Sequence, residues 1–344
     1  LRRARQALHD GAVDDARSVA EAAILAARRE GFDELVCELS ILAGQIEYAH
    51  GTIERCLERY DEAVDLARVL DRPDLEATAE LGRTLMRVRQ GLGRESTAAA
   101  EGAVRSAKRA GDPLLSSNAL RMLGNAHFVA GRRKPALRSY RRAVAVARDC
   151  GGSEAEAKAL NNVATCAHAL GQVGEALEAW RRAIVLKERV GAVASAMVTY
   201  ASMSGVLQML GHRDQAREMQ QRVFDHPRQD AYVALALSWS NRGDLCLFEG
   251  DLDAAIEHYT KASEGYREMG MNQLRTHALM GGIRVRLMRD RDADRDAVDE
   301  MLEQMGTIVR ETDSPEDLRR HLTTQAMVLD ARGEAAAGLQ MARR

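Results

Sequence analysis

The sequence predicts an all-α protein, a solenoid of about eight to nine helical hairpins with a period near 40 residues. Composition supports this prediction, because 46% of the 344 residues are hydrophobic but only 4% are aromatic, and 29% are charged. Alanine, leucine, arginine and glutamate, which favour helices, dominate the chain. The β-branched and aromatic residues that fill strands are too sparse for a large sheet. Glycines recur at a fixed period, and small residues follow them at fixed distances.

Each period predicts one pair of antiparallel helices. Small residues stand five positions after each periodic glycine, and alanine stands twelve positions after six of the seven. Two small residues seven positions apart lie on one stripe of a helix, where a second helix can approach closely. Glycine allows the positive φ that ends a helix, so we expect helix A over about 16 residues before it and helix B from about two residues after it. The glycines are spaced 40 or 39 residues apart: Gly11, Gly51, Gly91, Gly131, Gly171, Gly211 and Gly250.

The spacing loosens after Gly250. An eighth unit is expected to turn at about Asp290, inside a charged segment without glycine, and a ninth at Gly333. Pro227 is expected to end the sixth helix B at about Phe224, since proline interrupts helices. We therefore predict a single solenoid over residues 1–344, without a central core to divide into domains. Both ends fall inside a unit, which predicts that the chain is part of a longer protein.

Several units resemble the tetratricopeptide repeat. Leu120-x2-Leu123-Gly124 is followed by Ala136-x3-Tyr140, and Trp239-x3-Gly243 is followed by Ala255-x3-Tyr259. Residues 159–186 resemble the longer repeats of kinesin-light-chain-type, Pins-type and MalT-like proteins. Two departures are the period, which is about 34 residues in the usual repeat, and the missing closing proline. The resemblance implies a right-handed superhelix in which helix A lines the concave groove and helix B forms the outer wall.

Signals of catalysis are absent from the sequence. The nine histidines form no HExxH, and the glycine-rich segment 91–96 lacks the GK[ST] of a phosphate loop. A net charge of −2 provides no global attraction to nucleic acid or anionic membranes. We expect a protein that is not an enzyme, uses no cofactor or metal, and binds neither membranes nor nucleic acid. Five scattered cysteines without CxxC spacing predict core thiols in a reducing, cytoplasmic location.

Asparagines are the most informative polar residues. Asparagine is a poor helix former because its amide competes with the backbone, yet five of the six fall in predicted A helices. The resemblance implies that such asparagines hold the main chain of an extended peptide. Asn125 matches the Leu-Gly-Asn motif of Pins-type repeats, while Asn162 and Asn241 match the second asparagine of kinesin-light-chain-type repeats. The alternative is helix capping or hydrogen bonding between helices.

Neighbours on the same predicted face complete the candidate site. Arginine, lysine and histidine flank the asparagines, which makes the middle of the groove suited to an acidic segment or a C-terminal carboxylate. Farther along the chain the face becomes more apolar and carries one acid. The predicted partner-binding residues are Arg121, Asn125, Phe128, Lys158, Asn161, Asn162, His168, Asn241, Asp244 and Phe248.

The leading functional hypothesis is a scaffold for protein–protein interaction. Such a module would belong to a larger bacterial signalling protein and would regulate it by binding a peptide, a helix or another domain of the same protein in the groove. Two alternatives stay open at this point. One is a small-molecule-sensing domain of a MalT-like transcription regulator, and the other is a module for self-association through its end repeats.

Overall fold

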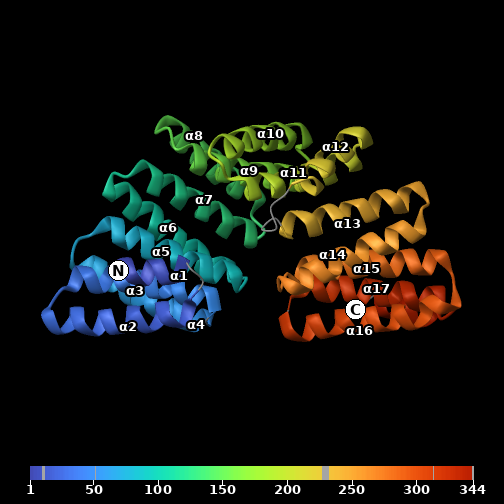
Figure 1. Cartoon of the computed structure of the whole chain (residues 1–344), viewed down its shortest axis with the longest axis horizontal. Coiled ribbons are helices and arrows are strands. Elements are labelled where there is room, and N and C mark those ends of the chain that lie inside the picture. The colour runs from blue at the N-terminus through green and yellow to red at the C-terminus, as the bar shows by residue number, and fades with distance from the viewer. Residues whose placement is uncertain (10–11, 51, 227–231, 313, 343–344) are drawn as a thin grey trace. The chain divides into compact units, whose positions relative to one another are not determined.

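The computed structural model describes residues 1–9, 12–50, 52–226, 232–312 and 314–342 (Figure 1). Over these residues the regular structure is entirely helical, with eighteen α-helices and one short 3-10 segment. The prediction of an all-α repeat of helical hairpins is therefore confirmed. Contacts group the chain into two compact units, Leu1–Val190 and Gly191–Arg344.

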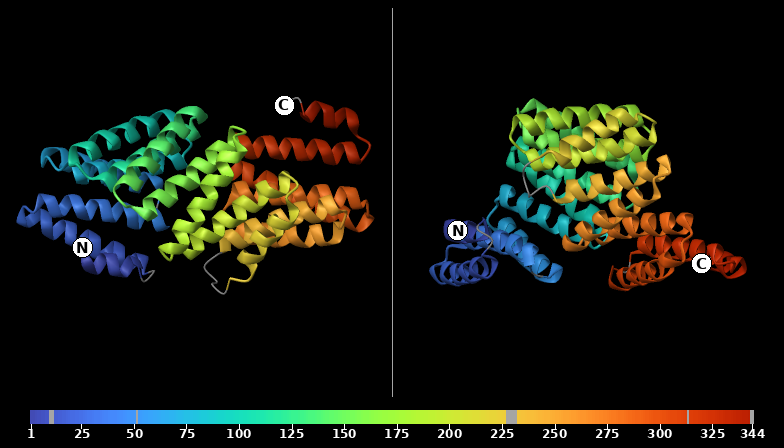
Figure 2. Two further views of the ribbon diagram at one scale, coloured as in Figure 1. Left: turned by 90° about the horizontal axis from the view of Figure 1, so that it is seen from above. Right: turned by 45° about the vertical axis from the view of Figure 1, so that its right-hand side comes forward.

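The first unit consists of ten helices in which odd-numbered members are A helices and even-numbered members are B helices. Consecutive helices pack antiparallel against each other, and the A helices α3, α5, α7 and α9 also contact one another in sequence (Figures 1 and 2). The A helices therefore form one continuous layer within this unit. The helices are α1 (Arg2–His9), α2 (Val13–Glu30), α3 (Asp33–His50), α4 (Ile53–Val69), α5 (Pro73–Arg89), α6 (Gly93–Ala110), α7 (Pro113–Val129), α8 (Arg133–Asp149), α9 (Ser153–Ala169) and α10 (Val173–Arg189).

The second unit continues the alternation of A and B helices. Its first B helix, α12, has 12 residues and ends at Phe224, where the sequence predicts the break. Pro227 itself lies outside the described residues. The helices are α11 (Val193–Met209), α12 (Arg213–Phe224), α13 (Tyr232–Glu249), α14 (Leu252–Glu268), α15 (Asn272–Arg289), the 3-10 segment η1 (Asp292–Asp294), α16 (Arg295–Thr312), α17 (Pro315–Ala331) and α18 (Ala335–Ala342).

Positive φ angles mark the turns between helices. Those from helix A to helix B have a left-handed residue at Gly91, Gly131, Gly171, Gly211, Gly250, Asp290 and Gly333, while Gly11 and Gly51 lie outside the described residues. The structure adds a second series, which the sequence reasoning missed. Turns from helix B to the next helix A also have a left-handed residue, at Gly31, Asp71, Gly111, Gly151, Gly191 and Gly270.

Aromatic rings of the B helices pack on glycines of the A helices. A Cβ atom built on Gly82 would lie 2.4 Å from the Tyr60 ring, and one on Gly124 would lie 2.3 Å from the Tyr140 ring. The tyrosines are almost fully buried. In the hairpins that have such a ring, one ring fills the space between closely spaced helices, so a low aromatic content is sufficient for this core.

Cysteines mostly follow the prediction of core thiols. All five are free, and four of them are buried. Cys150 is exposed, so the prediction was wrong for this residue. It lies at the C-terminal cap of α8, where the chain turns at the surface. None of the described helices combines the length and apolar character that crossing a membrane requires.

Candidate functional site

Asn125 and Asn162 lie on neighbouring A helices of the first unit, α7 and α9. The Oδ1 atom of Asn125 accepts two hydrogen bonds of 2.9 Å, one from the Tyr140 hydroxyl and one from Nδ2 of Asn162. Three consecutive helices are joined by these two bonds. The side-chain carbonyl of Asn125 therefore joins helices, as the alternative interpretation of hydrogen bonding between helices states. The hydrogen bond from Asn162 to this carbonyl fixes the orientation of the Asn162 amide.

Asn241 has a similar role on α13 in the second unit. Its Nδ2 donates to the carbonyl oxygen of Ala201 at 2.8 Å and to Oγ of Ser204 at 3.0 Å, both on the preceding A helix α11. Asp244 stands where Asn125 stands in its own repeat and accepts a hydrogen bond from the Tyr259 hydroxyl. Burial raises the pKa of Tyr259, and the Asp244 carboxylate raises it further. Burial and the carboxylate therefore both stabilise the neutral form of the tyrosine.

Arg121 lies one turn before Asn125 on α7. Burial lowers the pKa of this guanidinium, since removing water disfavours the charged form. Its Nε has no hydrogen-bond partner, and no carboxylate pairs with it among the residues that the structure describes. A partly desolvated cation without an acid costs free energy unless a partner supplies the negative charge. Arg121 is therefore the strongest point for an anionic ligand on these helices.

A second desolvated cation, Lys187, was missed by sequence reasoning. It is 5% exposed on α10, and burial lowers its pKa to about 8, with a further contribution from the charge of Lys158. Lys158 is itself exposed on α9 and pairs with Glu154 at 2.6 Å. The sequence gives no signal for the burial of Lys187, because a lysine in a charged B helix reads as solvated. Lys187 thus places a positive charge close to Lys158, whose own charge is paired with Glu154.

The remaining predicted residues divide between the two units. Phe128 and His168 are half-buried in the first unit, with the Arg133 guanidinium 4.9 Å from the Phe128 ring and the Trp180 ring 6.2 Å from that of His168. Asn161 is half-buried on α9. Phe248, on α13 of the second unit, is 69% exposed beneath the Arg213 guanidinium. The structure thus brings together seven of the ten predicted residues on α7 and α9, and places the other three on α13.

Comparison with known proteins identifies the fold. Residues 236–264 match the family model described as "Tetratricopeptide repeat". The fold is that of tetratricopeptide repeat proteins. Folds of this type are typical of protein-interaction modules. No curated protein sequence matches the chain.

Solved structures of this tetratricopeptide fold resemble the chain at low sequence identity. The apo form of the quorum sensor NprR from B. thuringiensis is 13% identical, with a TM-score of 0.64 over 99% of this chain and 95% of that one. A Rap protein complexed with competence and sporulation factor is 14% identical, with a TM-score of 0.52 over 78% and 77%. A STAND protein with a tetratricopeptide repeat sensor from Pyrococcus horikoshii is 13% identical, with a TM-score of 0.56 over 89% and 49%. At these identities the likeness shows the fold alone.

Proposed function

We propose that the first unit binds an acidic peptide segment of a partner protein, or of another domain of its own parent protein, on the A helices α7 and α9. The observation that carries this proposal is Arg121, a partly desolvated guanidinium without an acidic partner among the described residues. Such a group gains most from a ligand carboxylate, because charge-assisted hydrogen bonds are strong where water is excluded. The protein would act as a binding scaffold in a bacterial signalling protein.

In this proposal only Asn162 contacts the peptide, and Asn125 holds Asn162 in position. Asn125 uses its carbonyl to hold Tyr140 and Asn162, so it orients its neighbours. Asn162, whose amide nitrogen is fixed by that bond, would offer its carbonyl oxygen to a main-chain N–H of the peptide. A fixed amide loses less conformational entropy on binding than a free one. Arg121 would thus supply the affinity and Asn162 the alignment of the peptide.

The similar folds support a regulatory role. NprR is described as a quorum sensor, and the Rap structure contains competence and sporulation factor. In the Pyrococcus horikoshii protein the repeats are described as the sensor of a larger signal transduction ATPase, of which the alignment covers about half. By analogy, ligand binding on this chain would report to an attached domain.

A peptide array tests the proposal. The labelled full chain is applied to twelve-residue peptides of varied charge, alongside Arg121→Gln. We expect the wild type to select acidic peptides and the variant to bind them at least tenfold more weakly. The melting temperature of the variant should be equal to or higher than that of the wild type, because a desolvated charge is removed. Arg105→Gln, an exposed arginine on α6, is the matched control and should bind normally. Equal binding by Arg121→Gln would refute the proposal.

A further inference from the structure

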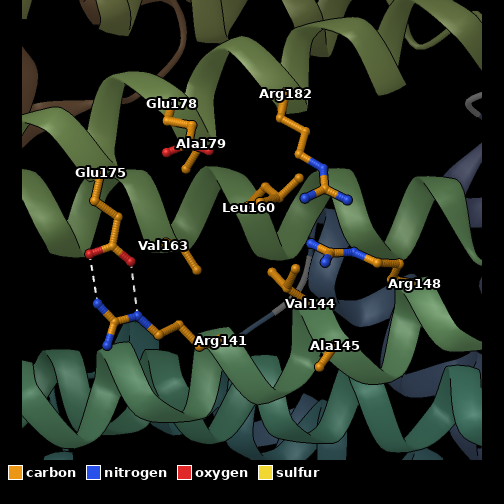
Figure 3. A pocket seen from close by; sticks show the side chains of 10 residues that line it. All are labelled: Arg141, Val144, Ala145, Arg148, Leu160, Val163, Glu175, Glu178, Ala179 and Arg182. Carbon is orange, nitrogen blue, oxygen red and sulfur yellow. Dashed lines mark hydrogen bonds and ion pairs between the residues drawn. The ribbon is translucent and has the colours of Figure 1, made fainter.

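A separate pocket of about 310 Å³ lies in the first unit between the B helices α8 and α10 and over α9 (Figure 3). Val144, Leu160 and Val163 give it an apolar floor. None of the ten predicted site residues lines it, so it is distinct from the site proposed above. Ligand sites usually enclose about 300–1,000 Å³, which places this pocket at the lower limit, with room for one or two side chains of a partner.

The two ends of the pocket differ in charge. At one end Arg141 and Glu175 form a two-pronged ion pair, with hydrogen bonds of 2.8 and 2.6 Å, and Glu178 lies on the same side (Figure 3). At the other end the guanidinium groups of Arg148 and Arg182 come together (Figure 3). The first end is neutral or acidic and the second is basic, so the pocket is polarised along its length.

The basic end has unused hydrogen-bond donors. Nε of Arg148 and a terminal nitrogen of Arg182 donate to the same oxygen of Glu156, at 3.1 and 2.7 Å. The Glu156 side chain is 8% exposed, whereas those of Arg148 and Arg182 are 49% and 44% exposed. Two cations thus share one buried carboxylate, and each guanidinium carries five N–H groups. Their remaining donors and the surplus positive charge lie at this end of the pocket.

The corresponding position in an earlier repeat is filled. Eighty residues before Leu160 and Val163 stand Glu80 and Arg83. Glu80 is 3% exposed, and Arg68 and Arg83 contact its Oε1 at 3.1 and 3.3 Å. Charged side chains therefore occupy the space between α4 and α6 that is open between α8 and α10.

A later repeat has a similar pocket but lacks the two arginines that share one acid. A pocket of about 240 Å³ lies between α14 and α16, at the matching place in the second unit. There Arg275 replaces Glu156 and Gln304 replaces Arg182, and the two are joined by a hydrogen bond of 2.6 Å. The pocket between α8 and α10 thus combines an apolar floor with two arginines that share one acid. The equivalent places between α4 and α6 and between α14 and α16 do not have this combination.

We propose that the pocket between α8 and α10 binds an acidic segment of a partner protein in which a large apolar side chain stands next to a carboxylate. The apolar side chain would lie on Leu160 and Val163, where about 25 cal/mol is gained for each Å² of apolar surface removed from water. The neighbouring carboxylate would accept hydrogen bonds from Arg148 and Arg182. Charge complementarity at the basic end argues for an acid and against a basic segment. Such a partner would contact the B-helix side of the unit independently of Arg121.

Defined peptides test this second site. Four fluorescein-labelled, C-terminally amidated eight-residue peptides alternate leucine with glutamate, leucine with glutamine, alanine with glutamate, or leucine with lysine. Fluorescence anisotropy with the full chain is expected to show the tightest binding for leucine–glutamate and at least tenfold weaker binding for the other three. The proposal would be overturned if any of the other three peptides bound as tightly as leucine–glutamate. It would also be overturned if leucine–glutamate did not bind at about 1 mM, a concentration that detects even weak complexes.

Two variants and one matched control locate the binding. Arg148→Gln with Arg182→Gln should weaken leucine–glutamate binding at least tenfold. Because that pair could disturb folding around Glu156, Ala145→Trp provides a second variant: Ala145 is exposed on the pocket wall, and the indole would block the pocket.

Arg68→Gln with Arg109→Gln is the matched control, because these two arginines also share one buried acid, Glu76, at 2.9 and 3.1 Å. All of these variants are made in the Arg121→Gln background, so that the site on the A helices does not contribute to binding. The control pair should leave leucine–glutamate binding within twofold of that background. Unchanged binding in both pocket variants, or an equal loss in the control pair, would contradict the assignment.

Discussion

At the scale of single residues, Arg121 and Gly124 of α7 both reduce the stability of their helix, but only Gly124 does so to allow close packing. Arg121 is a charged group that is partly desolvated, and this reduces the stability of the folded protein. Gly124 gives up helix propensity so that the Tyr140 ring can lie against the backbone. Residues that reduce stability without a packing benefit are candidates for function, whereas Gly124 has a packing benefit.

Gly124→Ala should therefore destabilise the first unit. Alanine normally stabilises a helix relative to glycine by about 1 kcal/mol, but the added methyl would overlap the Tyr140 ring. Overpacking in a tight core costs about 1–3 kcal/mol, so we expect a net loss in the free energy of unfolding, measured by urea denaturation. Gly174→Ala is the control, since a Cβ atom on this exposed helical glycine meets nothing within 4 Å. It should be neutral or stabilising, and a similar loss in both variants would argue against ring packing as the cause.

The asparagines and Lys187 show which site residues can be identified from the sequence and which cannot. The asparagines could be singled out because asparagine is unfavourable inside helices, and the structure places them at joints between helices. Whether an amide faces a neighbouring helix or a ligand depends on side-chain geometry, which one sequence does not contain. Lys187 could not have been found, because its burial depends on the packing of surrounding helices.

Helices and turns, the next scale, were predicted more completely. The period of 40 residues follows from the glycines at the turns from helix A to helix B, and the observed helix boundaries agree with it. The second series of turns was missed because aspartate replaces glycine at Asp71, which adopts φ 48°. Aspartate tolerates the left-handed region better than most residues, so the conformation persists where the glycine pattern does not.

Helix α12 shows a local departure from the pattern. Gln220 occupies the position that a large ring fills in α4, α8, α10 and α14, and it is fully buried. Neither polar atom of its amide has a hydrogen-bond partner among the described residues. A buried unsatisfied amide costs about 1–3 kcal/mol, so α12 is expected to be the least stable B helix of its unit. The sequence shows the replacement, but the missing partners are evident only in three dimensions.

For the whole molecule, the decisive property is that each hairpin packs mainly on its neighbours. Contacts fall into two compact units, and the stability of repeat proteins is approximately a sum of local terms. A sequence prediction of one solenoid over residues 1–344 describes the repeat but does not reveal this grouping, which depends on how tightly adjacent helices contact one another.

Unfolding of the two units can be followed separately because the chain has two tryptophans, Trp180 in the first unit and Trp239 in the second. In a Trp239→Phe background, Gly124→Ala should lower the urea midpoint reported by Trp180. In a Trp180→Phe background, the same substitution should leave the midpoint reported by Trp239 nearly unchanged, because distant repeats are weakly coupled. Equal shifts of both midpoints would show that the chain unfolds as one cooperative body.

The central claim, that an acidic segment binds to the A helices of the first unit, is tested most directly by hydrogen–deuterium exchange. The measurement compares the full chain alone with the chain saturated by the acidic peptide that the array selects. We expect slower exchange in α7 and α9, over residues 113–129 and 153–169, since bound peptide restricts their opening. Protection that appears only in other helices, or no change in α7 and α9 at saturation, would contradict the claim.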